Sequence, residues 1–258
     1  MIAYAVLGLV AFLASLLTFF SGFGLGTLLT PVFILFFPVD VAIALTAVVH
    51  FVNNLFKLVL VGRHADKSVL WRFGLPAVLA ALLGAWCLLQ ISELPPLFDY
   101  SLASKQVDVS PVKFIIGCLL IIFALLEILP AFQKIQFGRN KLILGGLLSG
   151  FFGGLSGHQG ALRSMFLIKT GLSKEAFIAT GVFIAIMVDL TRLSVYSSHF
   201  ATSGLGTSWP LVVSTSFFAI AGAYTGNKLL RKVTLTFIQR LVGLLLIIIG
   251  LLLAAGVI

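Results

Sequence analysis

The chain has 258 residues, of which 60% are hydrophobic and only 10% carry a charge. A soluble domain typically has about 25% charged residues, so this composition leaves too little polar surface for a water-soluble globule. The formal net charge of +9 would suggest nucleic acid in a soluble protein, but no basic stripe with interleaved aromatic residues is present. In a membrane protein, basic loops account for such a charge. We therefore expect a membrane protein with the lipid bilayer as its partner and no nucleic acid.

Seven apolar stretches approach the ~20 residues that a spanning helix needs. They are Ile2–Phe20, Val41–Val61, Phe73–Ile91, Val112–Leu129, Ala176–Tyr196, Trp209–Gly226 and Leu235–Ile258. These runs are continuous, whereas a barrel strand alternates over about 10 residues. Because a backbone in lipid must satisfy its own hydrogen bonds, the runs predict an all-α integral membrane protein.

The charges of the loops predict the orientation. Basic residues gather in Gly62–Arg72, Pro130–Lys141 and Asn227–Thr234, which the positive-inside rule places in the cytoplasm. Ser92–Pro111 has three acidic residues and one lysine, and Ser197–Ser208 has no Lys or Arg, so both should face outward. Both termini then lie on the extracytoplasmic side of a cell membrane, which we expect to be a bacterial inner membrane.

Two segments with a central glycine cluster should begin and end on one side of the membrane. Leu142–Ile168 starts and ends inside, and its 27 residues are too few for two comfortable spans. It is interpreted as a re-entrant helical hairpin or as two short broken helices. Met1–Phe37 begins and ends outside; its first arm is longer, so two spans remain an alternative there.

These two segments open two similar halves of the chain. Phe20–Gly26 aligns with Leu155–Gly160, and Ala42–Thr46 aligns with Ala176–Thr180. The offset stays at 134 to 135 positions, since Phe20 and Leu155 are 135 apart (155 − 20) and Ala42 and Ala176 are 134 apart (176 − 42). Each half holds one broken element and three spans, and because three is odd the halves would enter the membrane from opposite sides.

The result is an expected pair of inverted-topology repeats, an architecture common among transporters. Residues 1–129 form the first repeat and residues 142–258 the second, joined by the basic linker 130–141 in one membrane domain. In this architecture, interrupted elements at matching positions are the best sequence pointer to a substrate site.

The interrupted elements predict an anion site. A helix that restarts inside the membrane offers free N–H groups and its positive dipole end to an anion. Arg163, one turn into the second restarted helix, is costly in lipid unless it is paired, hydrated, compensated by an anion or snorkelling to the surface. The glycines have a structural alternative in close helix packing. The candidate substrate-binding residues are Ser21, Gly22, Gly24, Gly26, Thr27, Thr46, Ser156, Gly157, His158, Gln159, Arg163 and Thr180.

Polar residues within two spans form a second candidate set. His50 and Asn54 share a helix face at i, i+4, and Asp189 and Arg192 can pair at i, i+3. Arg192 lies toward the outer end, against the positive-inside trend, although a structural ion pair is the alternative. These four residues are the candidates for coupling or gating, and protons are the candidate coupling ion because histidine titrates near neutral pH.

The first half carries Gly22-Phe23-Gly24-Leu25-Gly26 with Pro31 beyond, and an Ala-x-x-x-Thr stretch follows in each half. This pattern, over nearly the whole chain, resembles the TauE/SafE sulfite exporter family. The second half departs from it, with fewer glycines, no following proline, and Arg163. The resemblance implies export of sulfite or of small organosulfonates such as sulfoacetate.

A secondary transporter that alternates access around a midplane anion site is the leading hypothesis. No glycine-rich loop ending in Gly-Lys-Ser/Thr is present, so no ATP is expected. The spacing of Cys and His supports no metal site, and we expect no cofactor and no enzyme. Gly154–Gly157 matches the Gly-x-Ser-Gly of rhomboid proteases, which leaves an intramembrane serine hydrolase using Ser156 as an alternative. An anion channel is another. The sequence leaves the anion, the direction of transport and a homodimer open.

Overall fold

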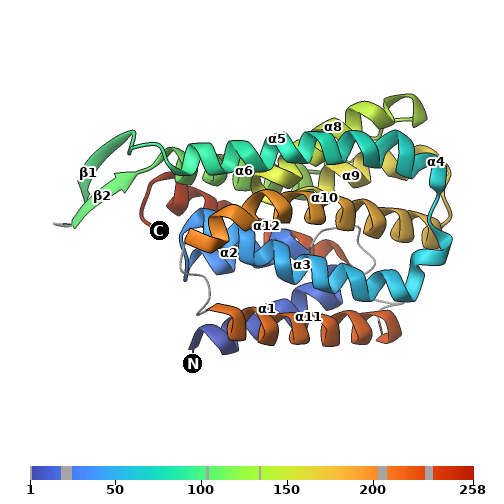
Figure 1. Cartoon of the computed structure of the whole chain (residues 1–258), viewed down its shortest axis with the longest axis horizontal. Helices are drawn as coiled ribbons and strands as arrows, with labels where there is room; N and C mark the ends of the chain where they lie inside the picture. Colours follow the sequence, from blue (N-terminus) through green and yellow to red (C-terminus); the bar gives the residue numbers. More distant parts are fainter. Residues whose placement is uncertain (1, 19–24, 103–104, 134, 203–207, 230–234) are drawn as a thin grey trace.

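The computed structural model describes residues 2–18, 25–102, 105–133, 135–202, 208–229 and 235–258. Its helices run side by side along the long axis, and both chain ends lie at the same end of the molecule (Figure 1). Four helical stretches in this described part are long and apolar enough to cross a membrane. They are Val39–His64, Lys67–Ser92, Pro111–Ile128 and Lys174–Ser197. The molecule is a helical bundle with a membrane protein's composition.

The first half begins with two short apolar helices. Its elements are α1 (Ile2–Thr18), α2 (Leu25–Ile34), α3 (Val39–Val61), η1 (Gly62–His64), α4 (Lys67–Val69), the π-helical turn η2 (Leu70–Gly74), α5 (Leu75–Ser92) and α6 (Pro111–Ile128). Asp66 starts α4, because its carboxylate accepts a hydrogen bond from the Val69 N–H at 2.9 Å. Pro111 at the first position of α6 suits a helix start, where no N–H is needed.

The second half follows after a short connection. Its elements are α7 (Pro130–Gln133), η3 (Arg139–Lys141), α8 (Leu142–Ser156), α9 (Gly160–Leu167), η4 (Ile168–Thr170), α10 (Lys174–Thr202), α11 (Trp209–Leu229) and α12 (Leu235–Ala254). The predicted spans agree with these helices to within a few residues, except that α10 continues past Tyr196 to Thr202.

A β-hairpin corrects the all-α expectation outside the bundle. Strands β1 (Phe98–Leu102) and β2 (Lys105–Val109) pair antiparallel within the segment expected only as an outer loop. Aromatic and β-branched residues alternate with polar ones here, a pattern that favours strands. The Tyr100 hydroxyl donates to the Ala255 carbonyl at 2.7 Å, which ties the hairpin to the end of α12.

Helices from the two halves pack in reciprocal pairs. Helix α1 packs along α11, and its counterpart α8 packs along α5; α3 packs on α10, and α6 on α12. At the last contact, a Cβ built on Gly117 would lie 2.6 Å from the Gly250 carbonyl oxygen. Gly117 and Gly250 occupy nearly equivalent places, 133 positions apart (250 − 117). Two repeats related by a two-fold axis would produce this pattern.

Glycines let α8 lie directly on α5. A Cβ on Gly150 would fall 2.1 Å from the Ala77 carbonyl oxygen, and one on Gly154 2.3 Å from that of Ala81. Only glycine fits where two backbones approach this closely, as in small-xxx-small packing between membrane helices. The glycines in the body of α8 therefore serve close helix packing, which holds this helix against α5 of the first half.

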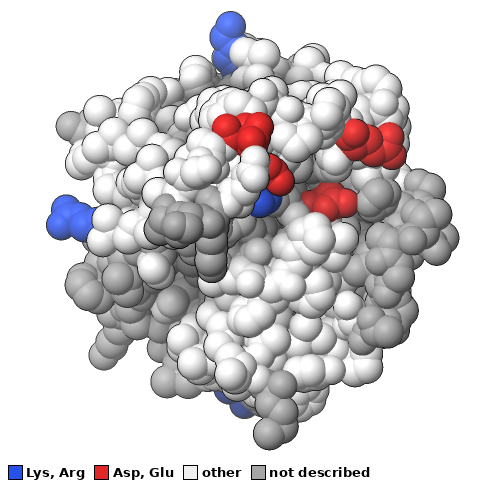
Figure 2. Space-filling view, turned by 90° about the vertical axis from the view of Figure 1, so that its left-hand side faces the viewer, with Lys and Arg blue, Asp and Glu red and all other residues white. Residues whose placement is uncertain are grey.

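The two ends of the bundle differ in charge. Figure 2 shows acidic side chains grouped on the end that carries the hairpin, with few basic ones among them. The turn between α3 and α5 lies at the other end (Figure 1) and carries Arg63, Lys67 and Arg72.

Candidate functional site

The break between α8 and α9 is a tight reversal. Gly157 has a φ of 80°, a left-handed conformation that favours glycine, and its N–H caps α8 by donating to the Gly153 carbonyl at 3.1 Å. Helix α9 then runs back along α8: the Ser149 hydroxyl donates to the Gln159 carbonyl at 3.1 Å, and the Phe137 N–H to that of Met165 at 3.0 Å. The segment is thus two short helices folded into a hairpin, with its tip inside the protein.

This tip meets the start of α2 from the first half. A Cβ on Gly26 would lie 3.4 Å from the Gly157 carbonyl oxygen and 3.8 Å from the Thr46 methyl carbon. Thr27 is buried in the first turn of α2. The structure therefore brings Gly26, Thr46 and Gly157, predicted separately in the two halves, into one place. Ser21, Gly22 and Gly24 lie outside the described residues.

Arg192 of α10 reaches the same place from the side. A Cβ on Gly157 would lie 2.9 Å from Arg192 Nη1 and 3.7 Å from Thr30 Oγ1. Both side chains are fully buried. Among the described residues, neither of these two atoms has a hydrogen-bond partner, nor does the buried Thr46 Oγ1. Thr30 was not predicted, although it lies one turn after Gly26 on the same face of α2.

The hairpin tip adds further polar atoms. The Nδ1 of His158 is 2.9 Å from the Ser156 carbonyl oxygen, and its ring stacks on Phe123 at a centroid distance of 5.7 Å. Its Nε2 and both polar atoms of the Gln159 side chain are buried, with no hydrogen-bond partner among the residues that the structure describes. Leaving a buried polar group unsatisfied costs roughly 1–3 kcal/mol, so such atoms mark places where a ligand or water would bind.

Arg163 and Thr180 lie beside the tip with different partners. Arg163 is 7% exposed, so it is not a surface residue, and within the described ranges its Nη1 has no hydrogen-bond partner. A Cβ on Gly181 would lie 3.4 Å from Arg163 Nε. The Thr180 hydroxyl accepts a hydrogen bond from the Asp66 N–H at 2.9 Å. This bond ties α10 to the start of α4, and the substrate role of Thr180 stays a prediction.

The four coupling candidates form a buried polar chain between α3 and α10. One Asp189 oxygen is 2.6 Å from His50 Nδ1, and the other accepts from Nε and Nη2 of Arg192 at 3.1 and 2.8 Å. The predicted Asp189–Arg192 pair is therefore present. Asn54 Nδ2 lies 3.1 and 3.2 Å from the two ring nitrogens of His50. The link between His50 and Asp189 joins the two halves, which spacing within one helix did not predict.

The buried charges around the tip are mainly positive. Lys57, Arg163 and Arg192 are at most 7% exposed, and Asp189 is fully buried. Among Arg163, Arg192 and Asp189, two guanidinium groups against one carboxylate leave a formal charge of +1 (2 − 1). Buried charge is costly unless compensated, so the site favours an anion.

The serine hydrolase alternative requires a histidine base on Ser156. Its hydroxyl instead donates to the Phe152 carbonyl at 3.0 Å, and the ring of His158 contacts the Ser156 backbone carbonyl. Tyr196, which was not predicted, donates to the Gly154 carbonyl and so fixes the last turn of α8. Both hydroxyls thus donate to backbone carbonyls of α8, and the substrate role of Ser156 stays a prediction.

Comparison with known proteins identifies the family of the chain. No curated protein and no solved structure with significant similarity was found. The family described as "Sulfite exporter TauE/SafE" matches residues 7–253, nearly the whole chain. The chain therefore belongs to the TauE/SafE family of multi-pass membrane transporters, a family associated with sulfur anions such as sulfite.

Proposed function

We propose that this protein is a secondary transporter that exports a small sulfur oxyanion such as sulfite, or an organosulfonate such as sulfoacetate. The observation that carries the proposal is the contact between the start of α2 and the α8–α9 turn beside Arg192 Nη1, a buried cationic group that has no hydrogen-bond partner among the described residues. Within the same described part of the chain, the hydroxyls of Thr30 and Thr46 are also unpartnered. An oxyanion bound there would receive hydrogen bonds that replace its hydration shell.

The anion would sit at the junction of two inverted repeats, 1–129 and 142–258. The reciprocal packing of α1 on α11 and of α8 on α5 supports this arrangement. Access would alternate by rocking one repeat against the other around the fixed site, with α8–α9 as a re-entrant hairpin. The termini and the β-hairpin would face outward, because their end is acidic whereas the α3–α5 turn is basic.

Cysteine labelling is expected to place the two ends of the bundle on opposite faces. Arg63→Cys, in the α3–α5 turn, should react with an impermeant thiol reagent only from the cytoplasmic face. Asp99→Cys, in β1, should react only from outside. Cys87 and Cys118 are replaced by serine beforehand to remove the background. Reaction of both positions from the same face would contradict the proposed topology.

Coupling would pass through the His50–Asp189–Arg192 chain. A proton on His50 leaves the imidazolium to neutralise Asp189, so that the charge of Arg192 is available to the anion. When that proton is lost, the Asp189 carboxylate again neutralises Arg192, and the affinity of the site for an anion falls. By linkage, anion binding would then favour proton binding to the same degree. Asn54 and Lys57 on α3 and Arg192 on α10 are the other groups that act on His50.

In proteoliposomes, the purified protein is expected to exchange labelled sulfite with saturable kinetics and to accumulate it against a gradient when a pH difference is imposed. His50→Gln should keep the exchange but lose the accumulation driven by the pH difference, because a glutamine amide cannot carry the proton. Sulfite flux that rises linearly with concentration would favour a channel. Absence of any flux of sulfite or sulfoacetate would contradict the proposed substrates.

A further inference from the structure

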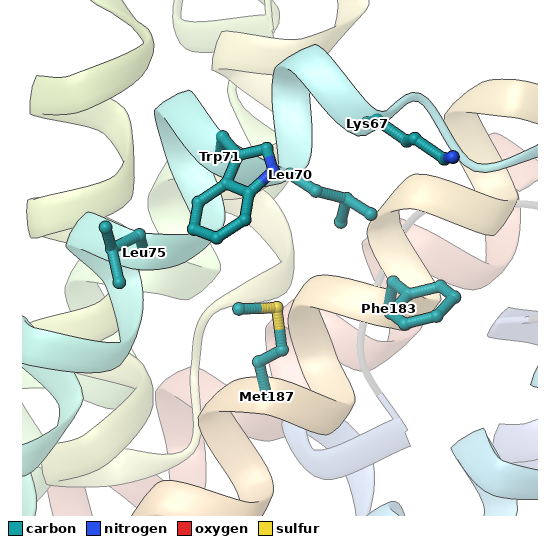
Figure 3. Close-up of a pocket in the computed structure, with 6 residues that line it drawn as sticks. All are labelled: Lys67, Leu70, Trp71, Leu75, Phe183 and Met187. Carbon is teal, nitrogen blue, oxygen red and sulfur yellow. The ribbon is translucent and has the colours of Figure 1, made fainter.

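A separate cavity lies at the surface of the bundle, away from the buried tip. Its volume is about 230 Å³, several times the roughly 30 Å³ that one water occupies in the liquid. Figure 3 shows its lining residues, which come from two regions of the chain. They are Lys67, Leu70, Trp71, Leu75, Phe183 and Met187. Lys67 is the sole charged residue among them, so the cavity suits a hydrocarbon better than water.

The cavity lies between the two halves. Its first wall is the α4–α5 segment, where the π-helical turn η2 widens the helix. The second wall is α10, and Met187 touches the first wall, since a Cβ on Gly74 would lie 3.3 Å from the Met187 methyl carbon. The hydrogen bond from the Asp66 N–H to Thr180 joins the same two walls. A molecule in this cavity would contact both halves.

The surroundings of the cavity identify its occupant. Trp71 is 70% exposed and Leu75 is 45% exposed, so both present apolar surface where the protein meets lipid. Tryptophan is enriched at the membrane–water interface. Lys67 lies at the edge of the group with its ammonium turned away from the apolar side chains (Figure 3), and the exposed Arg63 and Arg72 lie nearby in the chain. Basic pockets of this kind between membrane helices bind anionic lipid headgroups.

We propose that this cavity binds one acyl chain of an anionic phospholipid, whose phosphate is held by Lys67. The apolar lining takes the hydrocarbon, and the lysine at the rim supplies the charge complementarity. The lipid would brace the α4–α5 segment against α10. This inference concerns a lipid site and does not depend on which solute the protein transports.

Quenching of Trp71 by brominated lipids tests the proposal. The chain has three tryptophans, so Trp86→Phe with Trp209→Phe leaves Trp71 as the sole indole. The variant is placed in bilayers that contain brominated phosphatidylglycerol or brominated phosphatidylcholine at equal mole fraction. We expect a roughly five-fold preference of the Trp71 site for phosphatidylglycerol, the size expected of one lysine near an anionic lipid. Equal quenching by the two lipids would overturn the proposal.

Two further substitutions separate the headgroup from the chain. Lys67→Gln should remove the preference for phosphatidylglycerol without changing any buried residue. Lys169→Gln, at an exposed lysine outside the cavity, should keep this preference. Met187→Phe fills the cavity and should also remove the preference; Leu190→Phe, an exposed position one turn later on α10, is its control. A preference that survives both Lys67→Gln and Met187→Phe would show that the lipid binds elsewhere.

Discussion

Replacing Arg192 with lysine is expected to weaken sulfite binding about ten- to hundred-fold while the protein stays folded. Nε and Nη2 of Arg192 donate to Asp189, whereas Nη1 faces Gly157 and has no hydrogen-bond partner in the part of the chain that the structure describes. A lysine can keep the ion pair with Asp189. Its single ammonium group cannot also donate a hydrogen bond to an anion on the side of Gly157, as the guanidinium group can. One lost hydrogen bond to a charged group costs roughly 1.5–3 kcal/mol, and this free energy corresponds to a ten- to hundred-fold loss of affinity for sulfite.

Calorimetric titration of the purified protein with sulfite measures this effect. Arg139→Lys is the matched control, because Arg139 donates to the Thr170 carbonyl at the basic end of the bundle, outside the site. We expect Arg139→Lys to bind sulfite like the parent. Unchanged sulfite affinity in a folded Arg192→Lys variant would remove Arg192 Nη1 from the site and with it the observation on which the proposed function rests.

The membrane helices could be predicted from sequence because their signal is strong and local. Runs such as Val41–Val61 contain too few polar groups to lie anywhere but in lipid or a buried core, and α3 covers this run. The hairpin of α8 and α9 followed from a length argument combined with loop charges. The β-hairpin was not predicted, because apolar and polar residues alternate over only five residues in each strand. The acidic charges of the segment by themselves indicate only an outer loop.

The site was predicted in part, and the missing part depends on contacts between the halves. Gly26, Thr46 and Gly157 could be predicted one by one, because each belongs to a glycine break or to an Ala-x-x-x-Thr stretch that recurs in both halves. Thr30 gave no such signal, since a threonine inside an apolar helix commonly bonds only to its own backbone.

The partners of single side chains were equally beyond reach. Thr180 aligns with Thr46, yet its hydroxyl serves the Asp66 N–H, which depends on the path of the α3–α5 turn. The contact of His50 with Asp189 depends on how α3 packs on α10, and periodicity within either helix carries no information about that packing.

Neutralising Asp189 is expected to destabilise the protein and, at the same time, to strengthen its response to sulfite. Asp189→Asn leaves the Arg192 guanidinium buried without a counter-charge, and breaking a buried ion pair costs about 3–5 kcal/mol. Thermal unfolding in lipid nanodiscs should therefore show a markedly lower midpoint. The double variant Asp189→Asn with Arg192→Gln should recover most of the loss, because neither charge then remains.

The effect of sulfite on thermal unfolding distinguishes an Asp189–Arg192 pair that only stabilises the fold from one that takes part in anion binding. In Asp189→Asn, the anion would replace the missing carboxylate beside Arg192, and a ligand that binds only the folded state stabilises it in proportion to its affinity. Sulfite should thus raise the unfolding midpoint of Asp189→Asn more than that of the parent, and should have little effect on the double variant. If the pair served structure alone, sulfite would shift all three proteins equally. Transport should be lost in Asp189→Asn, because the site could no longer release its anion by returning the carboxylate to Arg192.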